Sequence, residues 1–139
     1  MKIFICVIFL ISFGFFGNCS AQKQQQGDGK TDAAVPQKIS TEEAKTIMDG
    51  DKPFILVDVR TEDEYKMIRI TGAVLIPVNE IASRAEKELP DRNAVLLLYC
   101  RSGVRSAGAA LTLAGMGYTN VYDMGGIVSW PHETVSDYN

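Results

Sequence analysis

The sequence predicts an α/β fold in which helices flank one small, mostly parallel sheet in a single domain. Apolar runs recur at residues 54–59, 73–76, 94–99 and 120–122, and each is continuous, as strands covered on both faces require. Segments with helical spacing lie between these runs. Residues 38–139 supply about a hundred positions, which is enough for one hydrophobic core and too few for two. Alternating strands and helices define the α/β class.

The first helices begin at caps that the sequence shows. Ser40, followed three residues later by Glu43, forms a capping-box pattern that predicts a helix over residues 41–49. Thr61 caps a second, short helix after the first apolar run. A third helix is expected over residues 80–88, between the second and third apolar runs.

The last helix is expected to begin shortly after Cys100. Small and apolar residues recur there at helical spacing, and they predict a face that packs closely on the sheet. These residues are Val104, Ala107, Gly108, Leu111, Ala114 and Gly115. Gly117 then ends the helix, because glycine readily adopts the left-handed conformation common at helix ends.

The first residues have the pattern of a secretory signal. A lysine after the initiator methionine precedes an almost wholly apolar run over residues 3–16, which is too short to span a bilayer. We expect a signal peptide over residues 1–18 and lipid modification of Cys19, as in bacterial lipoproteins. Cleavage after Ala21 is the alternative, and it would release an exported form without a lipid anchor. Both alternatives place the protein in the periplasm or cell envelope.

Residues 19–37 are expected to form a flexible linker to a domain over residues 38–139. Glutamine, glycine and charged residues dominate the linker, and it has no apolar periodicity. Over the whole chain, 14 lysines and arginines are dispersed among 17 acidic residues, for a net charge of −3. No nucleic-acid surface is expected, because the sequence has no basic stripe and no aromatic platform.

Cysteine usage leaves one thiol in the predicted domain. Cys6 is removed with the signal and Cys19 is lipidated or removed, so Cys100 remains. An unpaired thiol in an oxidising compartment is subject to oxidation and mispairing, which argues that it is used. The alternative is a small, inert core residue. The polar residues that follow Cys100 disfavour that interpretation.

The loop after the third apolar run carries the candidate chemistry. Cys100 is followed by Arg101, Ser102, Gly103, Val104 and Arg105. Backbone N–H groups, a positive helix end and two guanidinium groups favour a thiolate and attract an anionic substrate. Open parallel sheets bind ligands beyond the carboxyl ends of their strands, which is where Cys100 is placed. These observations predict sulfur or phosphate chemistry at Cys100.

Four separate stretches carry further motifs. They are residues 56–61 with Glu64 and Tyr65, 72–73 with 76–77, 100–106, and 125–126 with Trp130. In this order and at these intervals they resemble the motifs of single-domain rhodaneses, the sulfurtransferase family. The resemblance implies a sheet of about five mostly parallel strands and a Cys100 thiolate that accepts a sulfane sulfur as a persulfide. It implies transfer of sulfur from thiosulfate or a similar donor to cyanide or a thiol, without a cofactor or a metal.

Several residues around Cys100 receive expected roles. Backbone amides from Arg101 through Arg105 stabilise the thiolate and persulfide, with the Arg101 side chain as an exposed gate and the Arg105 side chain as a structural clamp. Ser106 either donates a hydrogen bond within the loop or caps the helix, and we favour the cap. Asp58 and Arg60 either border the pocket or join loops through an ion pair, and we favour the ion pair.

Two features distinguish this chain within the resemblance. Rhodaneses usually carry Gly-His-Ile-Pro before the second motif, whereas Arg69 stands in the place of that histidine. The only histidine is His132, so a Cys–His pair of the protease kind is not expected. Protein tyrosine phosphatases have a longer loop than the four residues that separate Cys100 from Arg105, and the shorter loop favours sulfur over phosphate.

The expected partners are a small anionic sulfur donor, a thiol or cyanide acceptor and, through a lipidated Cys19, the membrane. A monomer is expected. Two alternatives remain, a non-enzymatic binding module with this fold and a persulfide carrier. Retention of Cys100 with both arginines of the loop disfavours the binding module.

Overall fold

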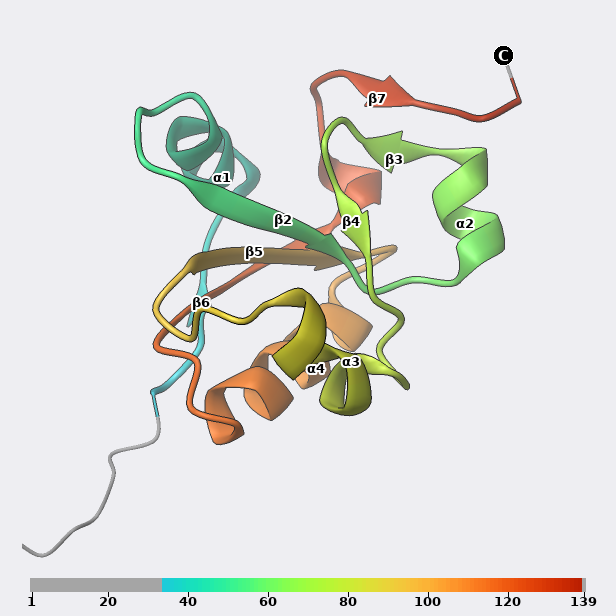
Figure 1. Cartoon of the computed structure of the whole chain (residues 1–139). Helices are drawn as coiled ribbons and strands as arrows, with labels where there is room; N and C mark the ends of the chain where they lie inside the picture. The colour runs from blue at the N-terminus through green and yellow to red at the C-terminus, as the bar shows by residue number, and fades with distance from the viewer. Residues whose placement is uncertain (1–33, 139) are drawn as a thin grey trace, which may run out of the picture. The chain divides into compact units, whose positions relative to one another are not determined.

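The computed structural model describes residues 34–138 (Figure 1). The predicted signal peptide, the predicted lipidation of Cys19 and most of the predicted linker lie outside these residues. Within the described part of the chain, no helix combines the length and the apolar character needed to cross a bilayer.

Five parallel strands form the main sheet, in the order β1-β6-β5-β2-β4. The strands are β1 (Gln37–Lys38), β2 (Phe54–Asp58), β4 (Val74–Leu75), β5 (Val95–Cys100) and β6 (Asn120–Gly126). The continuous apolar runs, which are typical of strands covered on both faces, therefore predicted the central strands correctly. The predicted α/β class is confirmed.

Helices cover both faces of this sheet (Figure 1). The helices are α1 (Thr41–Met48), α2 (Glu62–Met67), α3 (Ile81–Glu88) and α4 (Val104–Gly115), with a 3-10 helix η1 (Ile127–Ser129) after β6. Successive side chains of β5 point to opposite faces. Leu96 and Leu98 pack into the core beneath α3 and α4, whereas Leu97 and Tyr99 pack into the core beneath α1. The strand that ends at Cys100 is therefore held from both sides.

The caps form as the sequence predicts. Ser40 with Glu43, and Thr61 with Glu64, each form both hydrogen bonds of a capping box. Gly117 has φ 92° and lies just beyond the end of α4, which confirms its predicted role as the helix terminator.

The face of α4 that we predicted to pack on the sheet is wrong except at Ala114, because its other residues are exposed. The buried face of α4 instead carries Ala109, Ala110, Leu113 and Ala114.

Two pairings were not predicted. Strand β1 pairs with β6 at the edge of the sheet, so Gln37, the last residue of the predicted linker, belongs to the fold. Strands β3 (Arg69–Ile70) and β7 (Thr134–Val135) form a separate antiparallel pair. The last predicted strand, over residues 120–122, is longer than expected and extends to Gly126.

Candidate active site

Cys100 is the last residue of β5, and its sulfur faces the loop that follows. The N–H of Gly103 donates a hydrogen bond to Cys100 Sγ at 3.1 Å. Gly103 has φ 101°, a conformation that favours glycine, and it precedes the first residue of α4. Cys100 is only 1% exposed and packs on one side against the apolar core. The thiol therefore lies between hydrocarbon and a loop that presents N–H groups.

Two opposing effects set the pKa of the Cys100 thiol. Burial raises it, because a charged thiolate loses contact with water. Hydrogen bonds from the backbone N–H groups of Ser106, Gly103 and Ser102 lower it. The hydrogen bonds outweigh burial, so the pKa of Cys100 lies below its ordinary value. The sequence predicts that the backbone amides of residues 101–105 stabilise the thiolate. The N–H of Ser106, which also lowers the pKa of Cys100, lies one residue beyond that range.

Ser106 does not cap α4, which corrects the interpretation we favoured. Gly103 occupies the cap position and makes no side-chain capping bond. The fully buried Ser106 hydroxyl instead lies 2.6 Å from Asp123 Oδ1 and 3.1 Å from the carbonyl oxygen of Gly103. Asp123 Oδ1 also accepts a hydrogen bond from the N–H of Gly125 at 3.0 Å. The serine and the buried carboxylate thus join the cysteine loop to β6.

The glycine pair at the end of β6 lies against the cysteine loop. A Cβ at position 126 would lie 2.7 Å from Ser102 Cα, so the backbone leaves no room for a side chain there. The register between β5 and β6 also shifts near this point, between Leu98 and Cys100. This close approach explains the glycine that the closing motif carries at position 126.

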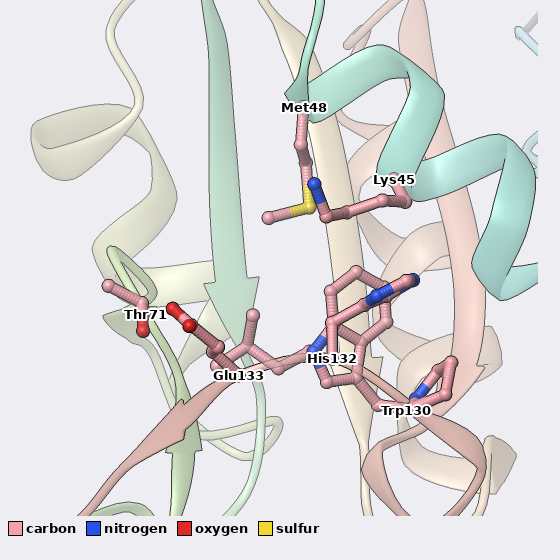
Figure 2. A pocket seen from close by; sticks show the side chains of 8 residues that line it. Lys45, Met48, Thr71, Trp130, His132 and Glu133 are labelled. Carbon is pink, nitrogen blue, oxygen red and sulfur yellow. The ribbon is translucent and has the colours of Figure 1, made fainter.

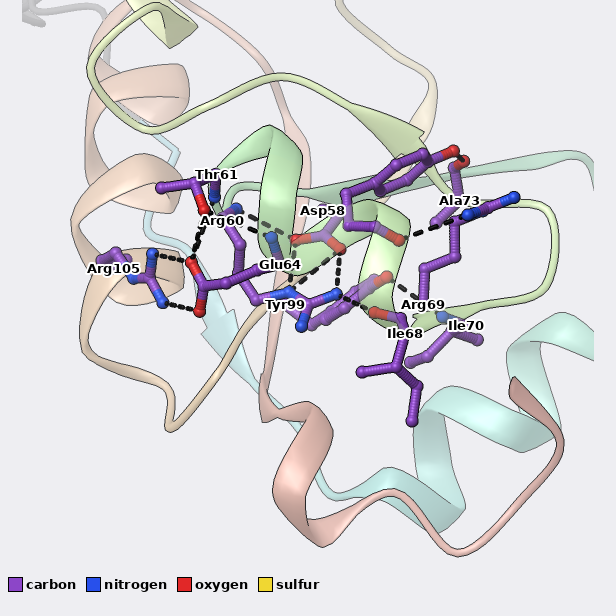
Figure 3. Close-up of polar contacts among 11 residues, drawn as sticks. Asp58, Arg60, Thr61, Glu64, Ile68, Arg69, Ile70, Ala73, Tyr99 and Arg105 are labelled. Atoms are coloured by element: carbon purple, nitrogen blue, oxygen red, sulfur yellow. Dashed lines mark hydrogen bonds and ion pairs between the residues drawn. The ribbon is translucent and has the colours of Figure 1, made fainter. Parts of the chain in front are cut away.

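Arg105 contacts a carboxylate from a distant helix. Its two terminal nitrogens lie 2.7 and 2.8 Å from the carboxylate oxygens of Glu64 in α2 (Figure 3). The hydrogen bond from Arg105 lowers the pKa of Glu64 from 4.5 to about 2, against the opposing effect of burial. The pair joins the start of α4 to α2, and the role of Arg105 as a structural clamp stays a prediction. In the sequence Glu64 is visible as a motif residue three positions after the helix cap Thr61, a pattern that predicts a capping box and gives no sign of the contact with Arg105.

Asp58 and Arg60 form a buried ion pair at the carboxyl end of β2 (Figure 3). Arg60 Nη2 lies 2.6 Å from Asp58 Oδ2 and also donates to the carbonyl oxygen of Ile68 at 2.6 Å. The guanidinium stands over the ring of Tyr99, 5.5 Å from its centre. The pair joins loops, as we favoured, and Arg60 also borders a cleft beside the cysteine loop.

That cleft has a volume of about 330 Å³. Its lining residues are Arg60, Glu64, Met67, Ile68, Arg101, Ile127 and Val128. Arg101 is exposed there, while Cys100 itself is covered, and the gate role expected for Arg101 stays a prediction. Val104, the first residue of α4, is 79% exposed, so only its backbone belongs to the loop structure around the sulfur.

His132 and Arg69 both contact residues outside the cysteine loop. His132 packs edge-on against Trp130 and lines a separate cavity of about 680 Å³ with Lys45, Met48 and neighbouring residues (Figure 2). No residue of the cysteine loop lines that cavity. Arg69, which replaces the motif histidine, forms an ion pair with Asp137 at 2.7 Å. Among the described residues no group of side chains has the composition of a metal site.

The fold and the loop agree with a known family. A family model for the rhodanese-like domain matches residues 40–133. The chain therefore belongs to the rhodanese-like family, and its match covers most of the described domain.

Its relatives include sulfurtransferases. The chain is 37% identical over 71 residues to thiosulfate sulfurtransferase PspE of Escherichia coli, a match that covers 51% of this chain and 68% of PspE. It is 33% identical over 97 residues to the putative sulfurtransferase YtwF of Bacillus subtilis, covering 70% of this chain and 92% of YtwF. The solved structure of a rhodanese with anions from E. coli matches with a TM-score of 0.58 at 32% identity, over 60% of this chain and 99% of that one. The chain is thus a rhodanese-like protein with sulfurtransferase homologues.

Proposed function

We propose that this protein moves a sulfane sulfur from thiosulfate, or a similar donor, through a persulfide on Cys100 to cyanide or a thiol. The observation that carries the proposal is the Cys100 sulfur held against N–H groups of the loop and of the start of α4, which lower the pKa of its thiol despite burial. The thiolate is the nucleophilic form of cysteine. The similarity to proteins named sulfurtransferases supports the same chemistry.

The reaction needs two displacements at sulfur. The Cys100 thiolate attacks the outer sulfur of thiosulfate, a new S–S bond forms, and the old S–S bond breaks as sulfite leaves with the electron pair. Cyanide or a thiolate then attacks the outer sulfur of the persulfide and regenerates the Cys100 thiolate. The N–H groups that stabilise the thiolate can stabilise the persulfide anion, and Arg101 can attract the anionic donor.

Mass spectrometry after mixing the protein with thiosulfate tests the first step. We expect the intact protein to gain the mass of one sulfur atom, and we expect Cys100→Ala to gain none while retaining the circular dichroism spectrum of the parent. Steady-state thiocyanate formation with cyanide then separates an enzyme from a persulfide carrier, because a carrier loads but turns over slowly. Full turnover by Cys100→Ala would contradict the proposal.

A non-enzymatic binding module is the remaining alternative. It predicts no sulfur gain from thiosulfate or from any other sulfane donor. The lowered pKa of Cys100 favours the sulfur-transfer proposal over this one.

We also propose that the protein is exported and anchored in the cell envelope through a lipidated Cys19. The apolar run over residues 3–16 and the small and polar residues after it support this. The intact mass of the protein from the membrane fraction tests the proposal. A mature chain that starts at Gln22 without acyl groups would exclude the lipid anchor.

A further inference from the structure

One side of α4 is apolar and exposed within the described part of the chain. We call Val104, Ala107, Gly108, Leu111 and Gly115 the outer face of α4. All of them are exposed, and their spacing places them on the same side of the helix. Val104 is 79% exposed and Leu111 66%. Exposed apolar residues that gather at one place mark an interaction site.

The described chain begins beside this face (Figure 1). Val35 is 82% exposed and lines a depression of about 220 Å³ with Ala107 and Leu111 of α4. It therefore extends the outer face by one more large apolar side chain. The fold is thus joined to the preceding part of the chain at the edge of the outer face.

The proposed lipid anchor would keep this face close to a bilayer. Ala34 lies 15 residues after Cys19, so the chain between them spans at most about 50 Å. A tether of this length holds the domain at a high effective concentration over the membrane, and weak contacts then suffice to dock it. The face nearest to the attachment point reaches the bilayer with the shortest tether.

The charge of this region fits a lipid surface. The whole chain has a net charge of −3, yet no acidic residue lies between Asp91 and Asp123, a segment that contains all of α4. Asp123 itself is buried. Glu86, on the neighbouring helix α3, is paired with Arg92. Lipid phosphate groups therefore meet no carboxylate on the outer face of α4, so the negative surface of the membrane does not repel it.

We propose that the outer face of α4, together with Val35, docks on the membrane to which a lipidated Cys19 anchors the chain. This inference rests on the proposed lipid anchor and adds a docked orientation to it. The side chains of Val104 and Leu111 enter the boundary between headgroups and acyl chains, as the apolar side of an interfacial helix does. Because Val104 directly follows the cysteine loop, docking places that loop at the membrane surface.

Quenching of tryptophan fluorescence by lipids tests the docking. The lipidated chain is reconstituted in vesicles of phosphatidylcholine with a minor share of phosphatidylglycerol, whose acyl chains either carry bromine, which quenches tryptophan on contact, or do not. In Leu111→Trp we expect brominated vesicles to quench most of the emission that the new indole adds to that of the parent. Val74→Trp is the matched control, because Val74 is 42% exposed on β4, at the opposite edge of the sheet from β1. Its added emission should be the same in both vesicles.

A carboxylate within the outer face should oppose docking. In the double variant Ala107→Glu with Leu111→Trp, we expect the ratio of docked to undocked protein to fall about tenfold, equivalent to about 1.4 kcal/mol. The reason is that a charged side chain resists transfer into the bilayer. Ala107→Ser with Leu111→Trp adds no charge and should dock like Leu111→Trp alone.

Two results would overturn the inference. One is equal emission of Leu111→Trp in plain and brominated vesicles. The other is an emission that shifts with protein concentration without lipid, because a second copy of the chain would then cover the face. An intact mass without acyl groups on Cys19 would count against the proposed anchor alone. The mature chain is then held on the same vesicles by a histidine tag before residue 20 and a nickel-chelating lipid, and the same comparison decides whether α4 docks.

Discussion

At the scale of single residues, the reactivity of Cys100 depends on whether burial or hydrogen bonding has the larger effect on the pKa of its thiol. An apolar core on one side disfavours the thiolate, as it does for inert core cysteines. Hydrogen bonds to a charged group contribute about 1.5–3 kcal/mol each, so a few N–H donors can outweigh that cost. The N–H groups of Ser106, Gly103 and Ser102 are these donors, and the Ser106 hydroxyl is bound to Asp123 instead.

Ser106→Ala should lower the stability of the fold, because it removes the hydroxyl that donates a hydrogen bond to the buried Asp123 carboxylate. A hydrogen bond to a charged group contributes about 1.5–3 kcal/mol, so we expect a loss of that order in the free energy of unfolding. Urea unfolding of the parent and of the variant measures the difference. Ser102→Ala is the control, because the Ser102 side chain is exposed and its replacement should change stability little. An unchanged free energy of unfolding in Ser106→Ala would contradict a stabilising role for this bond.

At the scale of elements, the ends of β5 and β6 shape the cysteine loop together. The loop bends over β6 where a side chain at position 126 would meet backbone atoms of Ser102. Asp123, from the same strand, accepts hydrogen bonds from Ser106 and Gly125. Residues of β6 thus contact the loop along its length and hold its position. The loop ends where α4 begins.

Gly126→Ala should disturb this contact. The added methyl group would lie 2.7 Å from Ser102 Cα, and because the obstacle is backbone, the loop must move. We expect a loss of about 1–3 kcal/mol in the free energy of unfolding, as for other overpacked sites, together with slower sulfur loading. Gly108→Ala is the control: no atom lies within 4 Å of its added Cβ, so it should stabilise α4 by about 0.4–1 kcal/mol. Urea unfolding and loading rates measure both variants, and a Gly126→Ala protein that loads like the parent would contradict the close contact.

The sequence predicted those features whose causes are local. Continuous apolar runs predicted β2 and β5, and capping residues predicted the starts of α1 and α2. It could not predict the two-residue strands β1, β3 and β7, because such short strands depend on partners far along the chain.

Contacts at the site between residues far apart in the sequence could not be predicted either. Cys100 and its loop form one continuous segment, which the sequence displays. Glu64 lies 41 residues from Arg105, and Asp123 lies 17 residues from Ser106, so no local pattern joins either pair. Ser106 was interpreted as a cap because serine near a helix start usually is one. Its actual partner comes from a neighbouring strand.

At the scale of the whole molecule, α2 links the cysteine loop to the C-terminal segment. Its Glu64 holds Arg105, and the carbonyl oxygen of Lys66 accepts a hydrogen bond from the N–H of Asp137 at 2.9 Å. Arg69, just beyond α2, pairs with the Asp137 side chain and stands over the ring of Tyr65 at 4.6 Å. The residue in place of the motif histidine therefore connects the C-terminal segment to α2.

The Glu64–Arg105 pair should make stability depend on pH. The pKa of Glu64 is lowered from 4.5 to about 2 by folding, so the pair contributes its full stability above about pH 4.5 and loses it as the pH falls toward 2. Glu64→Gln resembles the protonated carboxyl and should lower the free energy of unfolding by about 1–2 kcal/mol at neutral pH, allowing for partial exposure. The difference from the parent should shrink steadily through this acidic range.

Urea unfolding of the parent and of Glu64→Gln, measured from neutral pH downward, checks this expectation. Glu86→Gln is the control, because Glu86 is 69% exposed in its surface ion pair with Arg92 and should change stability little. Other carboxyl groups protonate in both proteins, so their effects cancel in the difference between them. A constant difference down to the most acidic pH would mean that the ionisation of Glu64 does not stabilise the fold, and that α2 is held against the cysteine loop by its packing alone.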